Sequence, residues 1–164
     1  MNFHFEFLDK SKKNVFLPTV FSILHSNMSV IAPTGNSYAD DEQIFLENVA
    51  PALDKAPRQI VLFYAEAELI GYFQYYVNGE LFMMEEIQLI REYHGSGLFA
   101  ELYRWLLPLL PDGITRVEAY SHKNNVKSQS ILRHLGLEVI EENKNNYHFR
   151  GEYTKLYRHY FENA

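Results

Sequence analysis

Apolar and polar positions alternate from the start of this chain: residues 2–8 alternate phenylalanine with polar residues, as a half-buried strand does. Apolar residues then recur at helical spacing over residues 16–28, with Pro18 expected in the first turn of that helix. A loop is expected over residues 31–39. A run of acidic residues then opens a second helix that continues to Leu53.

Three strands are predicted next, over residues 59–65, 69–77 and 81–90. Asn78-Gly79, between the second and the third, is a strong hairpin signal. The third strand leads through a glycine-containing turn into an amphipathic segment, residues 98–110, which is predicted to be a helix.

The C-terminal third is predicted to contain three strands and one helix. Asn124 or Asn125 caps that helix and Gly136 ends it. The strands are expected over residues 114–121, 137–141 and 146–157. The whole order is strand, helix, helix, three strands, helix, strand, helix, two strands. It predicts an α/β fold with a mixed sheet of about seven strands and helices on both faces, in a single domain over residues 1–164.

Composition excludes several classes of function. The net charge of −6 argues against nucleic-acid binding, which needs clustered Lys and Arg. The absence of cysteine excludes disulfides and thiolate chemistry, and the histidines show no metal-ligand spacing, so we predict no metal. No apolar run approaches the roughly 20 residues of a membrane helix. We therefore expect a cytoplasmic protein without a membrane partner.

The turn Gly95-Ser96-Gly97 offers the clearest candidate chemistry. Free backbone N–H groups at the start of a helix, together with the helix dipole, form a site suited to phosphate. The plainer interpretation is a turn whose glycines supply positive φ. Ser96 is then either a further phosphate donor or simply the N-cap of the helix.

Two stretches carry a resemblance to a known family. Residues 89–102 read Leu-Ile-Arg-Glu-Tyr-His-Gly-Ser-Gly-Leu-Phe-Ala-Glu-Leu, and further on Asn125-Val126-Lys127-Ser128 is followed by Leu132 and Leu135-Gly136-Leu137. In this order they resemble the motifs V-x-P-E-Y-R-G-K-G-I-G-x-x-L and N-x-x-A-x-x-x-Y-x-x-L-G-F of the GNAT superfamily of acyl-CoA-dependent N-acetyltransferases. The sequence departs from these motifs at His94, Phe99 and Leu132, where the family usually has Arg or Gln, Gly or Ala, and Tyr.

The resemblance implies acetyl-CoA as co-substrate and a set of residues that bind it. The pantetheine arm would pair with the backbone of Ile87, Gln88 and Leu89. The pyrophosphate would lie on the N–H groups of the turn. The residues implied there and in the second motif are His94, Gly95, Ser96, Gly97, Leu98, Phe99, Asn125 and Ser128. His94 is either a phosphate donor or a surface histidine.

The proton transfers are assigned to four candidate side chains. Glu85 and Glu86 lie in an apolar strand, and alternation sends them to opposite faces, so at most one is the base that deprotonates the amine. The other interpretation places them at the solvated rim. Because Leu132 replaces the family's usual acid, Tyr153, Tyr157 or a water would protonate the thiolate, or the thiolate would leave unaided. The other interpretation of the two tyrosines is that they pack on the face of the sheet.

The sequence therefore predicts an N-acyltransferase that moves an acetyl group from acetyl-CoA to a primary amine, in a small molecule or a peptide, by direct attack. The first alternative is a non-catalytic GNAT-like module that binds CoA or a protein. The second is an α/β nucleotide-binding domain, but the chain lacks the Lys of a P-loop and the third Gly of a dinucleotide fingerprint. A homodimer through the Tyr-rich C-terminal strand is also open.

Overall fold

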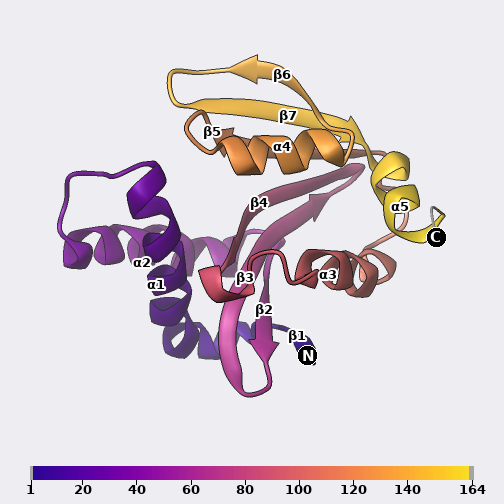
Figure 1. The fold of residues 1–164 in the computed structure, drawn as a ribbon. Helices are drawn as coiled ribbons and strands as arrows, with labels where there is room; N and C mark the ends of the chain where they lie inside the picture. The colour runs from indigo at the N-terminus through magenta and orange to yellow at the C-terminus, as the bar shows by residue number, and fades with distance from the viewer. Residues whose placement is uncertain (1, 163–164) are drawn as a thin grey trace. The chain divides into compact units, whose positions relative to one another are not determined.

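The computed structural model describes residues 2–162 and contains a mixed sheet of seven strands in the order β1-β2-β3-β4-β5-β7-β6 (Figure 1). This confirms the predicted α/β class and the predicted order of strands and helices, to which the structure adds one C-terminal helix. The elements are β1 (Phe3–Phe7), η1 (Lys10–Lys12), α1 (Lys13–Ile31), α2 (Tyr38–Lys55), β2 (Arg58–Ala65), β3 (Glu68–Asn78), β4 (Leu81–Leu89), η2 (Arg91–Tyr93), α3 (Leu98–Leu106), η3 (Leu107–Leu109), β5 (Arg116–His122), α4 (Val126–His134), β6 (Glu138–Glu142), β7 (Asn146–Glu152) and α5 (Tyr153–Phe161).

The sheet contains the parallel crossover that the sequence predicts. Strand β4 pairs in parallel with β5, from Leu81 opposite Arg116 to Met84 opposite Ala119, and α3 lies between them in the chain. β1 pairs antiparallel with β2, and β7 pairs antiparallel with both β5 and β6. β4 continues to Leu89, five residues beyond Met84, the last residue of this register.

Contacts divide the chain into two compact units. The first comprises the chain up to Gln74 together with Glu86–Ser96, and the second comprises Tyr75–Glu85 together with the chain from Gly97 onward. The division runs through β3 and β4, so no linker separates the units. The sequence-based expectation of a single domain stays a prediction.

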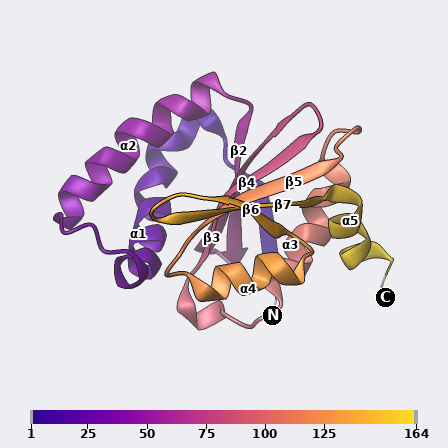
Figure 2. The ribbon, with the colours of Figure 1, turned by 90° about the horizontal axis from the view of Figure 1, so that it is seen from above.

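The first unit is built around α1 and α2, which lie side by side (Figure 2). Its core contains Leu17, Val20 and Ile23 from α1 with Leu53 from α2 and Tyr72 from β3. Ser37 caps α2, since its side chain accepts a hydrogen bond from the N–H of Asp40. Pro18 lies inside α1 rather than in its first turn, because the helix begins earlier than the apolar pattern indicates.

The segment Lys10–Ile31 has the length and mean hydropathy, 1.2, of a helix that could cross a membrane, although this is weak evidence by composition alone. The expectation that no apolar run approaches that length was therefore too strict. Of the qualifying window, 22% is buried. The buried residues include Leu17 and Val20, which are fully buried in the core of the first unit. Withdrawing α1 would therefore open that core.

In the second unit, α4 and α5 cover one face of the β5–β7–β6 sheet. Phe149 on β7 is fully buried on this face, and the guanidinium of Arg133 from α4 lies 5.4 Å from its ring centre. α5 contributes the fully buried Leu156. The predicted last strand, residues 146–157, is wrong in its second half, because β7 ends at Glu152 and the chain turns into α5.

Gly71 on β3 fixes how closely β4 approaches in the first unit. A Cβ at this position would lie 2.5 Å from the Gln88 carbonyl oxygen and 2.7 Å from the Phe63 ring. We expect Gly71→Ala to lower the free energy of unfolding by about 1–3 kcal/mol, measured by urea denaturation, because the added methyl overpacks the sheet.

Gly151→Ala is the comparison variant, since its closest contact, to the Gly136 carbonyl oxygen, is 3.1 Å. It should cost clearly less than Gly71→Ala. A loss for Gly71→Ala no larger than that of Gly151→Ala would show that β4 does not depend on this close approach.

Candidate functional site

The end of β4 carries a partly buried chain of polar side chains that links it to α1. The Asn27 side-chain amide, on α1, donates to Gln88 Oε1 at 2.9 Å, and Gln88 Nε2 donates to Glu86 Oε1 at 2.6 Å. Gln88 is buried, with 7% of its surface exposed. Of the two predicted carboxylates, Glu86 is thus the one that this amide orients, as expected for residues two apart on one face of a strand.

The carbonyl of Leu89 is the second fixed point of this strand end. It accepts from Asn27 Nδ2 at 2.9 Å and lies 2.8 Å from His94 Nε2. Because a carbonyl only accepts, His94 must donate from this nitrogen. Both lone pairs of the Leu89 carbonyl are then in use, so this carbonyl, which belongs to the predicted pantetheine-binding edge, is already engaged. His94 Nε2 faces β4.

The predicted phosphate loop follows as a turn with two glycines at positive φ, 76° at Gly95 and 82° at Gly97. Gly97, and not Ser96, is the N-cap of α3, and within the described chain no side chain caps this helix. Ser96 is exposed, and its N–H donates to the Tyr93 carbonyl. The first N–H groups of α3, from Leu98 and Phe99, are therefore left for water or an anion.

The second motif is used locally to start α4. Asn125 is its N-cap and accepts from the N–H of Ser128 at 3.1 Å, which confirms Asn125 as the capping residue. The predicted role of both residues in cofactor binding stays a prediction. Leu132, at the position of the family's usual tyrosine, is buried with 8% exposed.

The two candidate acids lie on α5 and not on a strand. The Tyr153 ring packs edge-on against Phe82, near the start of β4, and burial raises the pKa of Tyr153. Tyr157 stacks on Phe161 at 4.5 Å. The predicted cofactor edge lies at the other end of β4, so these contacts give no support to the acid role, which stays a prediction.

Sequence reasoning missed a cluster of charged residues in the second unit. Glu118 on β5 is buried, with 5% of its surface exposed, and His148 Nε2 lies 2.6 Å from its Oε1. Its other oxygen, Oε2, lies 3.2 Å from Nε of Arg116 and 3.5 Å from Nε of Arg150. All four side chains project from the face of β5 and β7 opposite Phe149, because they alternate with Val117 and Phe149 along their strands.

The electrostatics of this cluster keep Glu118 ionised. Burial acts to raise the pKa of Glu118, but the hydrogen bonds from His148 and Arg116 and the charge of Arg150 outweigh it, so the pKa of this carboxyl lies below its ordinary value. Glu118 and His148 lie 30 positions apart in the chain, and only the β5–β7 register brings them together. Glu118, between apolar neighbours in a strand, was the one available signal.

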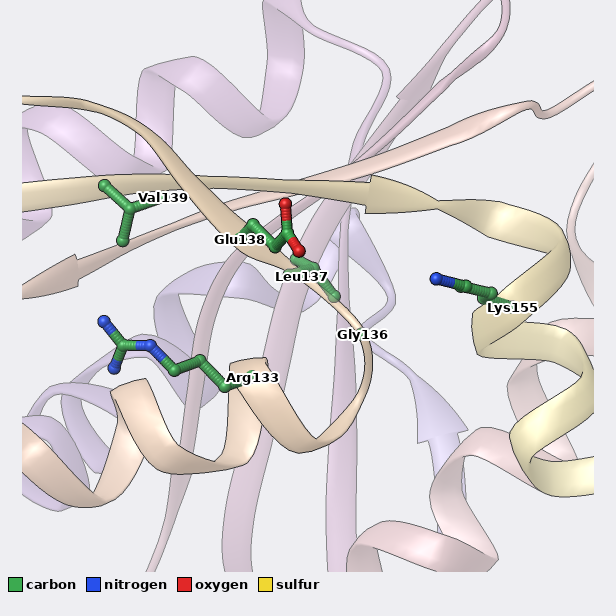
Figure 3. Close-up of a pocket in the computed structure, with 6 residues that line it drawn as sticks. All are labelled: Arg133, Gly136, Leu137, Glu138, Val139 and Lys155. Atoms are coloured by element: carbon green, nitrogen blue, oxygen red, sulfur yellow. The ribbon is translucent and has the colours of Figure 1, made fainter.

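A shallow groove of about 420 Å³ lies elsewhere in the second unit, along the end of α4, the start of β6 and α5 (Figure 3). Figure 3 shows Lys155 reaching from α5 toward Glu138, with Arg133 extending along α4 below Val139. None of the site residues predicted from the sequence lines it. Across residues 2–162, no group of three or more side chains is placed to hold a metal ion.

Comparison with known proteins gives matches in structure alone. No protein-family profile matches the chain, and no curated protein matches it in sequence. An acetyltransferase from Thermus thermophilus is similar at a TM-score of 0.71 and 15% identity, covering 93% of this chain and 97% of its own. The PaiA N-acetyltransferase of Thermoplasma acidophilum, solved with coenzyme A, is similar at 0.68 and 14% identity, covering 93% and 100%.

The aminoglycoside acetyltransferase AAC(6')-Ib, also solved with coenzyme A, is similar at a TM-score of 0.65 and 16% identity, covering 96% of this chain and 98% of its own. A further similar structure, from Desulfovibrio desulfuricans, is described as an acetyltransferase of the GNAT family, at a TM-score of 0.65 and 14% identity, covering 92% of this chain and 99% of its own. The chain has the GNAT fold. At these identities the likeness establishes the fold alone. In this GNAT fold, β4, the two-glycine turn and α3 are continuous in the chain, as the first motif implies.

Glu118 gives a test of the charged cluster. Its pKa is lower in the folded state, so the ionised carboxylate stabilises the fold above its unfolded pKa of about 4.3, and this contribution is lost as pH falls through the lower folded pKa. We expect Glu118→Gln to lower the free energy of unfolding at pH 7 by about 2–4 kcal/mol, since it removes the buried charge that pairs with His148 and with the two half-exposed arginines.

The difference from the unaltered protein should shrink when the urea denaturation is repeated below pH 4. Glu142→Gln is the control, because Glu142 forms only an exposed ion pair with Lys123 and should cost less than about 1 kcal/mol. An equal, pH-independent loss in both variants would contradict the assignment of Glu118 as the ionised centre of the cluster.

Proposed function

We propose that this protein binds acetyl-CoA and transfers its acetyl group to a primary amine. The observation that carries the proposal is the uncapped start of α3, placed directly after β4 by a turn with glycines at positive φ. Solved proteins of the same fold include complexes with coenzyme A. The pyrophosphate would accept hydrogen bonds from the N–H groups of Gly95 and of Gly97 to Phe99, favoured by the α3 dipole, while the Ser96 N–H stays on the Tyr93 carbonyl.

The pantetheine arm would pair with the backbone of β4 at Ile87 and Gln88, whose neighbour Leu89 is already held through its carbonyl. The polar chain from Asn27 through Gln88 keeps this strand end in place. A strand fixed before the ligand arrives loses little freedom on binding, which favours affinity.

The transfer needs one base and one bond exchange. Glu86, oriented by Gln88, would take a proton from the substrate ammonium, directly or through water. The free amine attacks the thioester carbonyl carbon and the C–N bond forms; the nitrogen then loses its extra proton to water, the C–S bond breaks, and CoA leaves as the thiolate, which takes up one proton. A thiol is far more acidic than an alcohol, so water suffices to protonate the CoA thiolate. No tyrosine is then needed at position 132, where this chain has leucine.

The acceptor class is an amine. One protein of the same fold is an aminoglycoside acetyltransferase, and aminoglycosides carry amines. The net charge of −6 favours encounter with cationic substrates. We also propose that the protein is cytoplasmic and forms a homodimer.

A module that binds CoA or a protein without catalysis is the second candidate. It is favoured by Leu132, which cannot donate a proton, and by Asn125 and Ser128, which are engaged in capping α4. It predicts CoA binding without turnover on any amine.

Gly97→Ala tests the binding loop. We expect it to weaken acetyl-CoA binding at least tenfold by calorimetry, about 1.4 kcal/mol, because an L-residue resists φ near 82° and shifts the N–H groups. Gly113→Ala is the matched control: its φ is 90° and its Cβ position is equally open. It should lose similar stability and keep its affinity. Unchanged affinity in a folded Gly97→Ala protein would exclude this loop.

Glu86→Gln and Glu85→Gln separate the two candidate bases. With an acceptor that is turned over, Glu86→Gln should lower kcat/KM by about 10²-fold or more. The loss should be largest at the pH values at which the base of the unaltered protein is an ionised carboxylate. Glu85→Gln should stay near the unaltered protein, because Glu85 projects from the other face of β4. Equal, small effects of both substitutions would show that neither residue is the base and that both are solvated residues at the rim of the strand.

A further inference from the structure

Three side chains form a row across the charged face of the second unit, one from each neighbouring strand. His148 on β7 lies opposite Tyr120 on β5 and opposite Glu141 on β6. The Tyr120 ring stacks on the imidazole, with centroids 4.3 Å apart and planes at 16°. On the other side, His148 Nδ1 lies 3.7 Å from Glu141 Oε2. The His148 imidazole therefore lies between an aromatic ring, that of Tyr120, and a carboxylate, that of Glu141, which is nearest to Nδ1.

One acceptor in this row of side chains has no hydrogen-bond donor. Glu118 is held ionised by Arg116 and Arg150, so it can only accept, and His148 must donate to it from Nε2. In the neutral imidazole the lone pair then lies on Nδ1. This atom is buried and makes no hydrogen bond within residues 2–162. Two acceptors, Nδ1 and the Glu141 carboxylate, thus face each other with no donor to join them.

A buried acceptor without a donor is destabilising, and a ligand that supplies the donor recovers that loss. A single ammonium nitrogen carries three N–H donors and can reach both acceptors at about 2.8–3.0 Å each. The Glu141 side chain is 80% exposed and Tyr120 is 53% exposed, so rotation of either side chain opens a path to Nδ1. The stacked ring also offers a π-face beside the cation.

We propose that His148 Nδ1 and the Glu141 carboxylate form a subsite for the ammonium group of a cationic substrate, with Tyr120 beside it. The inference rests on the proposed function for its role, and it narrows the acceptor to aliphatic amines that carry their charge at neutral pH, in preference to uncharged aromatic amines. The Glu118 charge does not compete for the ligand, because Arg116, Arg150 and His148 already share it.

The test follows the ring nitrogens of His148 by ¹⁵N NMR at pH 8 during titration with n-butylammonium chloride. We expect the Nδ1 resonance to shift to saturation. n-Butanol, which lacks the charge, and tetramethylammonium, which lacks N–H donors, should produce no saturable shift. Glu141→Gln should raise the apparent Kd for n-butylammonium about three- to tenfold, as expected for loss of one exposed charge.

Glu138→Gln is the control on the same strand, because Glu138 is also exposed but lies opposite Arg150. It should leave the Kd unchanged. A His148 ring that carries protons on both nitrogens at pH 8 would supply the missing donor internally and overturn the inference, as would a response that Glu141→Gln does not alter. The titration contains no CoA, so a failure of the proposed function appears separately, as absent acetyl-CoA binding.

Discussion

The carbonyl of Leu89 is the point on which the candidate cofactor site depends. It accepts from Asn27 on α1 and from His94 in the following loop, and so joins the helix, the strand end and the turn in one bonded group. Gly71 keeps β3 close enough for this arrangement, since any Cβ there would collide with the Gln88 carbonyl. The position of the two-glycine turn follows from how β4 ends.

The second unit is organised around a different constraint, a buried negative charge. Glu118 gathers two arginines and a histidine on the face of the sheet opposite the apolar one. A buried carboxylate is tolerable only when it is paired, so the charge of Glu118 dictates which proton His148 carries. The unpaired nitrogen of His148 is therefore a consequence of the fold, and it supplies a recognition element that the β4 site does not contain.

Periodicity and turn residues were enough to predict nearly every element, because apolar spacing and the glycine and proline positions are local signals. The error at residues 153–157 shows the limit. Aromatic alternation over Tyr147, Phe149 and Tyr153 indicated a strand, while the helical spacing of Tyr153, Leu156 and Tyr160 continued beyond it.

The candidate site was predictable only where its residues are neighbours in the chain. The glycine turn could be located from its sequence. The contacts of Gln88 with Asn27 and of His148 with Glu118 join residues 61 and 30 positions apart, and they depend on packing and strand register that no local pattern records. Likewise, the choice of Gly97 over Ser96 as the N-cap depends on a backbone angle and not on a side-chain preference.

The central claim, that this GNAT fold is built to hold an acyl-CoA, is tested most directly by isothermal titration of the unaltered protein with acetyl-CoA, CoA and ATP. We predict saturable binding of acetyl-CoA and CoA at one site per chain. We predict binding of ATP at least about tenfold weaker, since ATP lacks the pantetheine arm that pairs with β4. Absence of acetyl-CoA and CoA binding, or binding of ATP with equal or higher affinity, would contradict the central claim.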